Sequence, residues 1–126
     1  MQKTIIIVDD EPHVIRILRM ALEKENYRVF TAYNGESALE ILEEYSPDIL
    51  ITDIDMPRMN GKELIHQIDE KFPNRNFLII ILTSRAERDH RVWASEIPNL
   101  EFLEKPISVN NLKQILENYL IARHES

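Results

Sequence analysis

The chain has 126 residues, of which 44% are hydrophobic, and its formal net charge is −7. This length suits one domain with a sizeable core, so we expect residues 1–126 to form a single domain. The lack of cysteine excludes a disulfide framework and a thiolate metal site, the negative charge opposes nonspecific binding to nucleic acid, and no apolar run approaches the roughly 18 residues of a membrane span. We therefore expect a cytoplasmic protein that binds neither nucleic acid nor a membrane.

Short apolar runs recur along the chain, and each is followed by residues with helical spacing. Continuously apolar runs indicate strands that are buried on both faces. The predicted strands are Thr4–Val8, Arg28–Ala32, Asp48–Thr52, Phe77–Thr83 and Leu100–Leu103.

The helical stretches between and after these runs have start signals of their own. Pro12 fits the first turn of the first helix, Asn34 can cap the second, the third begins near Asn60, and Ser108 can cap the fifth. We expect residues 122–126 to be a frayed tail. The fourth helix has only a thin apolar stripe, Ala86, His90, Trp93 and Ile97. The apolar positions of the other helices are Val14, Ile17, Leu18, Ala21 and Leu22; Ala38, Leu39, Ile41 and Leu42; Leu64, Ile65 and Ile68; and Leu112, Ile115, Leu116, Tyr119 and Leu120.

Five β-α repeats of this kind predict a parallel sheet with helices on both faces. The expected fold is α/β, a flavodoxin-like (βα)5 three-layer sandwich whose five strands lie in the order 2-1-3-4-5. In such a sheet, ligands bind beyond the carboxyl ends of the strands, where the strand order reverses. The first and third strands are neighbours at that point.

Acidic residues follow both of these strands. Asp9 and Asp10 come after the first strand, and the stretch "TDIDMP" places Asp53 and Asp55 at the end of the third. Acids at a helix start can simply complement the helix dipole, and this explanation is sufficient for Asp9, Asp10 and Glu11 alone. Together with Asp53 on the adjacent strand, the carboxylates instead suit a hard divalent ion, most simply Mg²⁺.

The remaining strand ends add a hydroxyl and an ammonium group. "ILTS" ends the fourth strand with Thr83 and Ser84, and "LEKP" ends the fifth with Lys105. Taken singly, such residues are usually a polar strand edge and a solvated lysine. With a metal and three carboxylates, they make a phosphoryl-transfer site in which a carboxylate can attack phosphorus.

At these spacings, the combined motifs resemble the receiver domains of two-component response regulators over essentially the whole chain. They are "IIIVDDEP", "ILITDIDMPRMNG", "IIILTS" and "FLEKPIS". The resemblance implies that Asp53 accepts a phosphoryl group from the phosphohistidine of a sensor histidine kinase or a phosphotransfer protein.

The resemblance also implies roles for the residues around Asp53. Asp9 and Asp10, with Asp53 and the main-chain carbonyl of Asp55, would hold Mg²⁺, for which Mn²⁺ can substitute. Lys105 would contact the phosphoryl group, and the Lys105–Pro106 bond would be cis. Thr83 and Phe102 would be the switch residues, whose movement changes a surface made by the fifth strand and the fourth and fifth helices.

A downstream effector protein or an output domain would read this surface. The resemblance leaves open whether the chain stands alone or belongs to a longer regulator, and whether phosphorylation produces a homodimer. The domain would catalyse only its own phosphorylation and dephosphorylation, so it would not be an enzyme in the usual sense. In place of the Gly-Ala pair that the family usually has before the fifth strand, this chain has Pro98-Asn99.

Other interpretations remain open at this point. Asp55 and Arg85 flank the site, and we hypothesise that they pair and slow hydrolysis of the acyl phosphate, although both can also be merely solvated. "ILITDIDMP" also resembles the nucleophile loop of haloacid dehalogenase-like phosphatases, which would make Asp53 the nucleophile of a hydrolase. That loop normally follows the first strand. A nucleotide binder is improbable, because two glycines make no glycine-rich phosphate loop.

Overall fold

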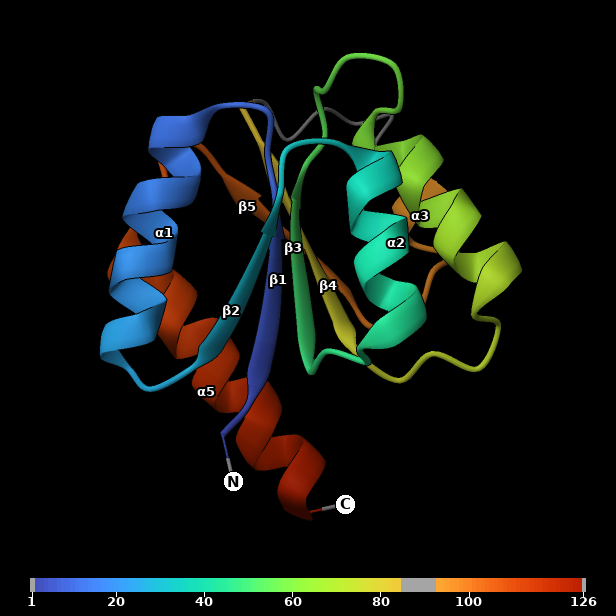
Figure 1. Cartoon of the computed structure of the whole chain (residues 1–126). Coiled ribbons are helices and arrows are strands. Elements are labelled where there is room, and N and C mark those ends of the chain that lie inside the picture. Colours follow the sequence, from blue (N-terminus) through green and yellow to red (C-terminus); the bar gives the residue numbers. More distant parts are fainter. Residues whose placement is uncertain (1, 85–92, 126) are drawn as a thin grey trace.

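A computed structural model describes residues 2–84 and 93–125, and its centre is a parallel five-stranded sheet (Figure 1). The strand order is β2-β1-β3-β4-β5, which confirms the predicted flavodoxin-like topology. The strands are β1 (Thr4–Val8), β2 (Arg28–Ala32), β3 (Ile49–Asp53), β4 (Leu78–Thr83) and β5 (Leu100–Glu104).

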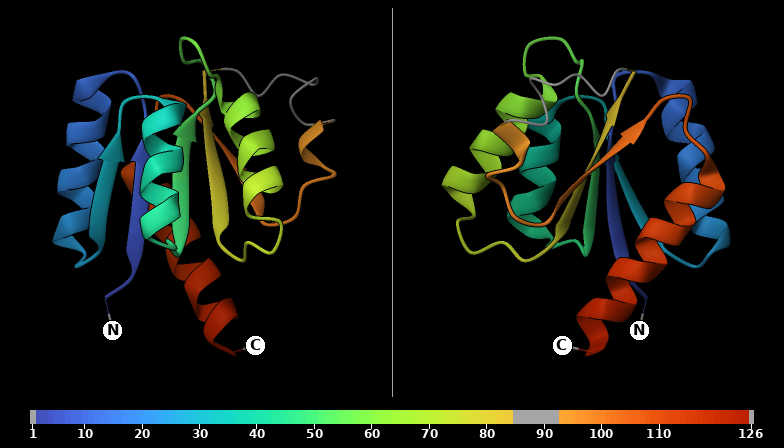
Figure 2. Two further views of the ribbon diagram at one scale, coloured as in Figure 1. Left: turned by 45° about the vertical axis from the view of Figure 1, so that its right-hand side comes forward. Right: turned by 180° about the vertical axis from the view of Figure 1, so that it is seen from behind.

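Helices cover both faces of the sheet, and the two helix layers enclose separate cores (Figures 1 and 2). Helices α2 (Gly35–Glu44) and α3 (Gly61–Lys71) pack on one face, and α1 (Pro12–Lys24) and α5 (Val109–Glu125) pack on the other. Within β1, Ile6 and Val8 face α2 and α3, whereas Ile5 and Ile7 face α1 and α5. Because both faces are covered, alternate residues are buried on opposite sides, and residues 5–8 are all apolar.

Polar side chains cap three of the helices as the sequence predicts. The Asn34 side chain accepts a hydrogen bond from the amide of Ser37 at 2.8 Å. Asn60 and Glu63 form a reciprocal capping box at the start of α3. The Ser108 hydroxyl accepts from an amide in the first turn of α5 at 3.2 Å. These contacts satisfy amides that have no partner inside the helix.

Two expectations about the helices are wrong. In α1, Leu18 and Leu22 are buried as predicted, but Ile17 is 57% exposed and Ile15 is buried in its place, because the helix turns the stripe centred on Leu18 toward the sheet. Residues 122–125 belong to α5 and are not a frayed tail.

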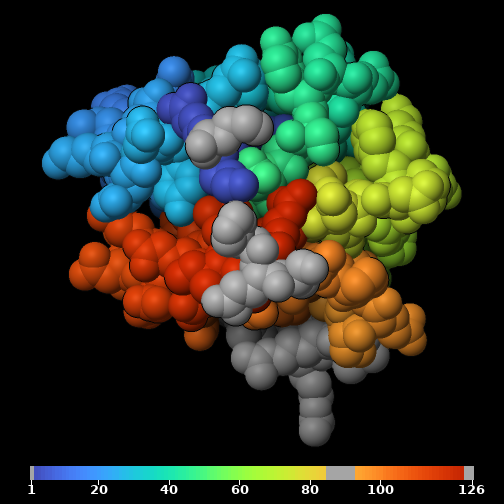
Figure 3. Space-filling model, turned by 90° about the horizontal axis from the view of Figure 1, so that it is seen from below, coloured from blue at the N-terminus to red at the C-terminus, as the bar shows by residue number. Residues whose placement is uncertain are grey.

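The last turn of α5 is tied to the amino ends of the strands. Arg123 donates to Asp48 at 3.2 Å, and the other carboxylate oxygen of Asp48 accepts from the amide of Thr4. From below, the end of α5 (red) lies beside the start of β1 (dark blue) (Figure 3). This contact connects the C-terminal part of the chain to the end of the sheet that lies farthest from the acidic residues.

The predicted fourth helix falls largely on residues 85–92, outside the described residues. Trp93 and Ala94, where the description resumes, are helical. Asn99 then adopts a φ of 55°, and its carbonyl accepts from the amide of Ile79 at 2.9 Å. Asparagine tolerates this left-handed conformation better than most residues, so Pro98-Asn99 still leads into β5. Within the described ranges, no helix is both long and apolar enough to cross a membrane.

Candidate functional site

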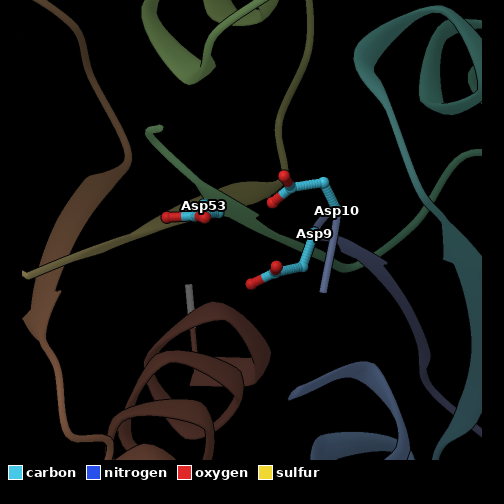
Figure 4. A group of neighbouring side chains, drawn as sticks. All are labelled: Asp9, Asp10 and Asp53. Carbon is cyan, nitrogen blue, oxygen red and sulfur yellow. The ribbon is translucent and has the colours of Figure 1, made fainter. Parts of the chain in front are cut away.

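Three carboxylates meet at the carboxyl ends of β1 and β3 (Figure 4). These strands are parallel neighbours, with Val8 paired to Thr52, so the residues that follow them lie together. One oxygen each of Asp9, Asp10 and Asp53 lies within 4.8 Å of the others. Asp9 is fully buried and Asp53 is 4% exposed, while Asp10 lies at the surface. The sequence prediction that these three acids come together is therefore correct as geometry.

Asp9 is fixed by the backbone around it and has one oxygen to spare. Its Oδ1 accepts from the amide of Glu11 at 2.9 Å, and its own amide donates to the carbonyl of Ala32. Its Oδ2 is buried without a hydrogen-bond partner among the described residues. An unsatisfied buried acceptor costs free energy, and the cost is larger for a charged group. This oxygen is therefore available to a cation.

Asp53 ends β3, and the chain folds back tightly behind it. The amide of Gly61 donates to the carbonyl of Ile54 at 2.8 Å. A Cβ on Gly61 would lie 2.7 Å from the backbone oxygen of Asp53, so only glycine fits this position without movement of the backbone. The close approach fixes the start of α3 against the residue that carries the carboxylate.

Lys105 places a positive charge between the two buried carboxylates. Its Nζ lies 3.4 Å from Oδ1 of Asp53 and 3.7 Å from Oδ2 of Asp9. The Lys105–Pro106 bond is cis, as the resemblance implied, and the amide of Lys105 donates to the carbonyl of Thr83 at 2.7 Å. The ammonium group is thus held at the same edge of the sheet as the acids.

Burial and mutual repulsion dominate the electrostatics of the site. Burial and the charge of Asp9 raise the pKa of Asp53 to about 6, against the opposing effects of Lys105 and the amide of Asp55. Burial also raises the pKa of Asp9, although the hydrogen bond from Glu11 lowers it. For Lys105, burial lowers the pKa, but Asp53 and Asp9 outweigh it and the net shift is upward. One ammonium group does not neutralise the cluster.

The donor set fits Mg²⁺. All three side chains offer oxygen, the ligand that hard divalent ions prefer, and the spare oxygen of Asp9 belongs to this group. His13 lies 3.3 Å from Glu11 and is not among the clustered ligands. The three carboxylates therefore have the chemistry of a divalent-cation site, and the carboxylate of Asp53 is a buried member of it.

The other predicted site residues lie at varying positions around this cluster. Thr83 ends β4 and is 2% exposed. Asp55 is exposed, with its amide directed at Asp53. Arg85 lies outside the described residues, so its pairing with Asp55 stays a prediction. Phe102 is half-buried on β5.

The sequence gives no sign of a role for Lys62, which lies near Phe102 through a contact with Trp93. Trp93 packs edge-on against Phe102, with 6.4 Å between ring centroids, and Lys62 lies over the Trp93 ring. A lone lysine in the first turn of a helix gives no sequence signal for such a contact. Only the packing of segments that are far apart in the chain brings Lys62 to the tryptophan.

Comparisons with known proteins agree on one family. The sequence profile described as response regulator receiver domain matches residues 5–117. The chain is 33% identical over 108 residues to the response regulator GtcR of Aneurinibacillus migulanus, covering 86% of this chain and 43% of that protein. It is 34% identical over 130 residues to the alkaline phosphatase synthesis transcriptional regulatory protein PhoP of Bacillus subtilis, and this match covers 100% of this chain and 53% of that protein. The chain thus spans about half the length of these curated relatives.

A solved structure extends the likeness to the fold. The receiver domain protein from Clostridium thermocellum matches with a TM-score of 0.85 and 27% sequence identity, covering 97% of both chains. The likeness therefore extends over nearly the whole length of both molecules.

Proposed function

The chain belongs to the response regulator receiver domain family, and from this premise we propose that Asp53 is its phosphoacceptor in a two-component phosphorelay. The single observation that carries the proposal is the environment of Asp53: a buried carboxylate with Nζ of Lys105 at 3.4 Å and Asp9 and Asp10 beside it. A nucleophile for phosphoryl transfer needs such charge balance, since it must approach an anionic group.

The proposed reaction moves a phosphoryl group from nitrogen to oxygen. An ionised carboxylate oxygen of Asp53 forms a bond to phosphorus while the bond from phosphorus to the imidazole nitrogen of the donor phosphohistidine breaks. The imidazole leaves with the bonding electrons, and an acyl phosphate remains on Asp53. Lys105 would offset negative charge on the phosphoryl oxygens.

Asp9 and Asp10, with Asp53 and the main-chain carbonyl of Asp55, would hold Mg²⁺ or, in its place, Mn²⁺. When bound, the ion would neutralise the carboxylates and the incoming phosphoryl group. The fixed position of Asp9 supports this assignment, because its Oδ1 is engaged by the amide of Glu11 while Oδ2 has no hydrogen-bond partner among the described residues.

The acyl phosphate would then act through Thr83 and Phe102 on the surface formed by β5, α5 and the predicted fourth helix. New acceptors on Asp53 would bias an existing conformational equilibrium, since the modification favours the state that contacts it better. A downstream effector or an output domain would read the change, with a sensor histidine kinase or phosphotransfer protein as donor. The domain, which we take to be residues 1–126, would work in the cytoplasm and act on no substrate besides its own phosphoryl group.

A labelling experiment tests the proposal. With Mg²⁺ and the small phosphodonor acetyl phosphate, the intact mass of the protein should show one added phosphoryl group. Asp53→Asn should abolish the label, whereas Asp55→Asn, which removes an exposed carboxylate two residues further on, should retain it. Equal labelling of Asp53→Asn would refute the assignment. Sustained turnover of p-nitrophenyl phosphate would instead favour a phosphatase related to the haloacid dehalogenases.

A further inference from the structure

Three side chains connect the first turn of α3 to β5. The ring of Trp93 meets Phe102 edge-on, with 6.4 Å between centroids and 74° between planes. Nζ of Lys62 lies 5.5 Å from the centroid of the Trp93 ring. Both aromatic rings are partly buried and pack against the core under α2 and α3. The three residues come from separate segments, so the fold alone brings them together.

Both ends of this contact chain adjoin the candidate site. Lys62 directly follows Gly61, which is packed against the backbone of Asp53. Phe102 lies on β5, the strand that leads to Lys105. The contacts therefore run from the backbone of the proposed phosphoacceptor, through α3, to the strand before the lysine that contacts it. A movement of Phe102 must either carry Trp93 along or break their contact.

Lys62 is well placed to hold the tryptophan, because no acidic side chain among the described residues pairs with its charge. Within residues 2–84 and 93–125, no acidic side chain forms an ion pair with Lys62, and the neighbouring Glu63 is engaged in the capping box with Asn60. A cation over the face of tryptophan is the strongest pairing of its kind among aromatic side chains.

We propose that Lys62 and Trp93 form a latch that positions Phe102 and restrains its movement. The inference rests on the proposed phosphorylation of Asp53 for its regulatory meaning, although the latch itself is a property of the chain before phosphorylation. Lys62 is exposed, so the contact has the strength of a surface cation–π pair. Loss of that contact changes a conformational equilibrium by about two- to fivefold.

The first experiment needs no phosphoryl group. Trp93 is the only tryptophan of the chain, so the tryptophan emission and its quenching by acrylamide come from this ring, and a comparison of Lys62 variants isolates the contribution of the lysine. Lys62→Met should raise the quenching constant, because the ring is no longer held against Phe102, while Lys62→Arg keeps the cation and should retain the wild-type value. Lys71→Met is the matched control, since Lys71 lies in the last turn of α3 and pairs with Glu43 at 4.0 Å.

Equal quenching in Lys62→Met and the wild type would overturn the latch. Because Lys62 is at the surface, we expect all four proteins to fold, and thermal unfolding checks this directly. A rise in quenching that Lys71→Met shows equally would also overturn it, because the effect would then be a general consequence of lost charge on α3.

The second experiment measures the restraint on the switch. Beryllofluoride with Mg²⁺, a mimic of the phosphoryl group, is titrated while Trp93 emission is followed. Lys62→Met should bind the mimic about two- to fivefold more tightly, because a restraint on the rearranged state has been removed. Lys71→Met and Lys62→Arg should bind as the wild type does, and unchanged or weaker binding by Lys62→Met would overturn the regulatory role.

The two proposals fail in distinguishable ways. If the wild type neither binds the mimic nor accepts a phosphoryl group on Asp53, the proposed function is wrong, and the quenching comparison still decides whether the latch exists. If Asp53 is phosphorylated normally but Lys62→Met alters neither quenching nor affinity, the proposed function stands and the latch is refuted.

Discussion

Replacing Asp53 with asparagine is expected to stabilise the metal-free protein at neutral pH. Burial and the repulsion from Asp9 raise the pKa of Asp53 from 3.8 to about 6. In that range, the folded state binds the proton more tightly than the unfolded state, so folding stability falls as the pH rises from about 4 to about 6. Asparagine resembles the protonated carboxyl group in shape and carries no charge, so the variant avoids this loss.

The size of this difference in stability follows from the shift in the pKa of Asp53. A change from 3.8 to about 6 corresponds to about 3 kcal/mol, since each pKa unit is worth about 1.4 kcal/mol. Asp53 is only 4% exposed, so solvent screening reduces this value little. We therefore expect Asp53→Asn to exceed the wild type by about 3 kcal/mol at pH 7 and by about 1.5 kcal/mol at pH 5.

Urea unfolding followed by Trp93 fluorescence and circular dichroism measures these differences. The experiment is run in a chelator at several pH values, with Asp55→Asn as a control that removes an exposed carboxylate and should change stability by less than about 0.5 kcal/mol. Added Mg²⁺ should narrow the gap by stabilising the wild type. A variant no more stable than the wild type at pH 7, or a gap that does not shrink toward pH 5, would refute the reasoning.

Three further changes test other parts of the structure. Gly61→Ala should lower the free energy of unfolding by about 2 kcal/mol, because its Cβ would lie 2.7 Å from a backbone oxygen. Gly35→Ala should lower it by less, since the nearest atoms to its Cβ belong to the flexible side chain of Met59. Equal losses of stability in urea unfolding would contradict this prediction. Asp10→Asn should weaken Mg²⁺ binding in calorimetric titration by about tenfold or more, since the loss of even an outer-shell partner typically lowers metal affinity by that factor. Unchanged affinity would show that Asp10 is not a ligand. Arg123→Gln should lower the free energy of unfolding by less than about 1 kcal/mol but speed amide hydrogen exchange in the last turn of α5. Unchanged exchange would show that the ion pair with Asp48 does not stabilise this turn.

The strands and caps could be predicted because their signals are local. Short runs rich in apolar residues located each strand to within a residue, although β3 extends to Asp53 itself and so makes the proposed phosphoacceptor the last residue of the strand. Asn34, Asn60 and Ser108 bond to amides only three residues away. Hydrogen bonds of such short range are encoded in the sequence spacing.

The buried face of α1 was harder to predict, because this helix is apolar around much of its circumference. Val14, Ile15, Ile17 and Leu18 allow two overlapping stripes, and both satisfy helical spacing. Only packing against the sheet selects Ile15 and Leu18 and leaves Ile17 in solvent. The extension of α5 has the same cause, since the partner of Arg123 is 75 positions away in the sequence.

At the site, the sequence identified the acids but not their different environments. Asp9 and Asp10 are adjacent and chemically identical, yet one is fully buried and the other exposed. Adjacent residues at a strand end point in different directions. The backbone hydrogen bond from Glu11 that fixes Asp9 depends on where α1 begins. The contact between Lys62 and Trp93 likewise needs the tertiary structure.

The electrostatics of Asp53 connect stability to function. Because the pKa of Asp53 is raised only to about 6, its carboxyl group is still mostly ionised at pH 7, even though burial disfavours the charged form. Lys105 alone does not remove this cost, because its single charge faces two buried carboxylates at 3.4 and 3.7 Å. Any cation that binds the cluster must therefore stabilise the fold and lower the pKa of Asp53 together. A metal that raised stability without making Asp53 more acidic would have to bind elsewhere.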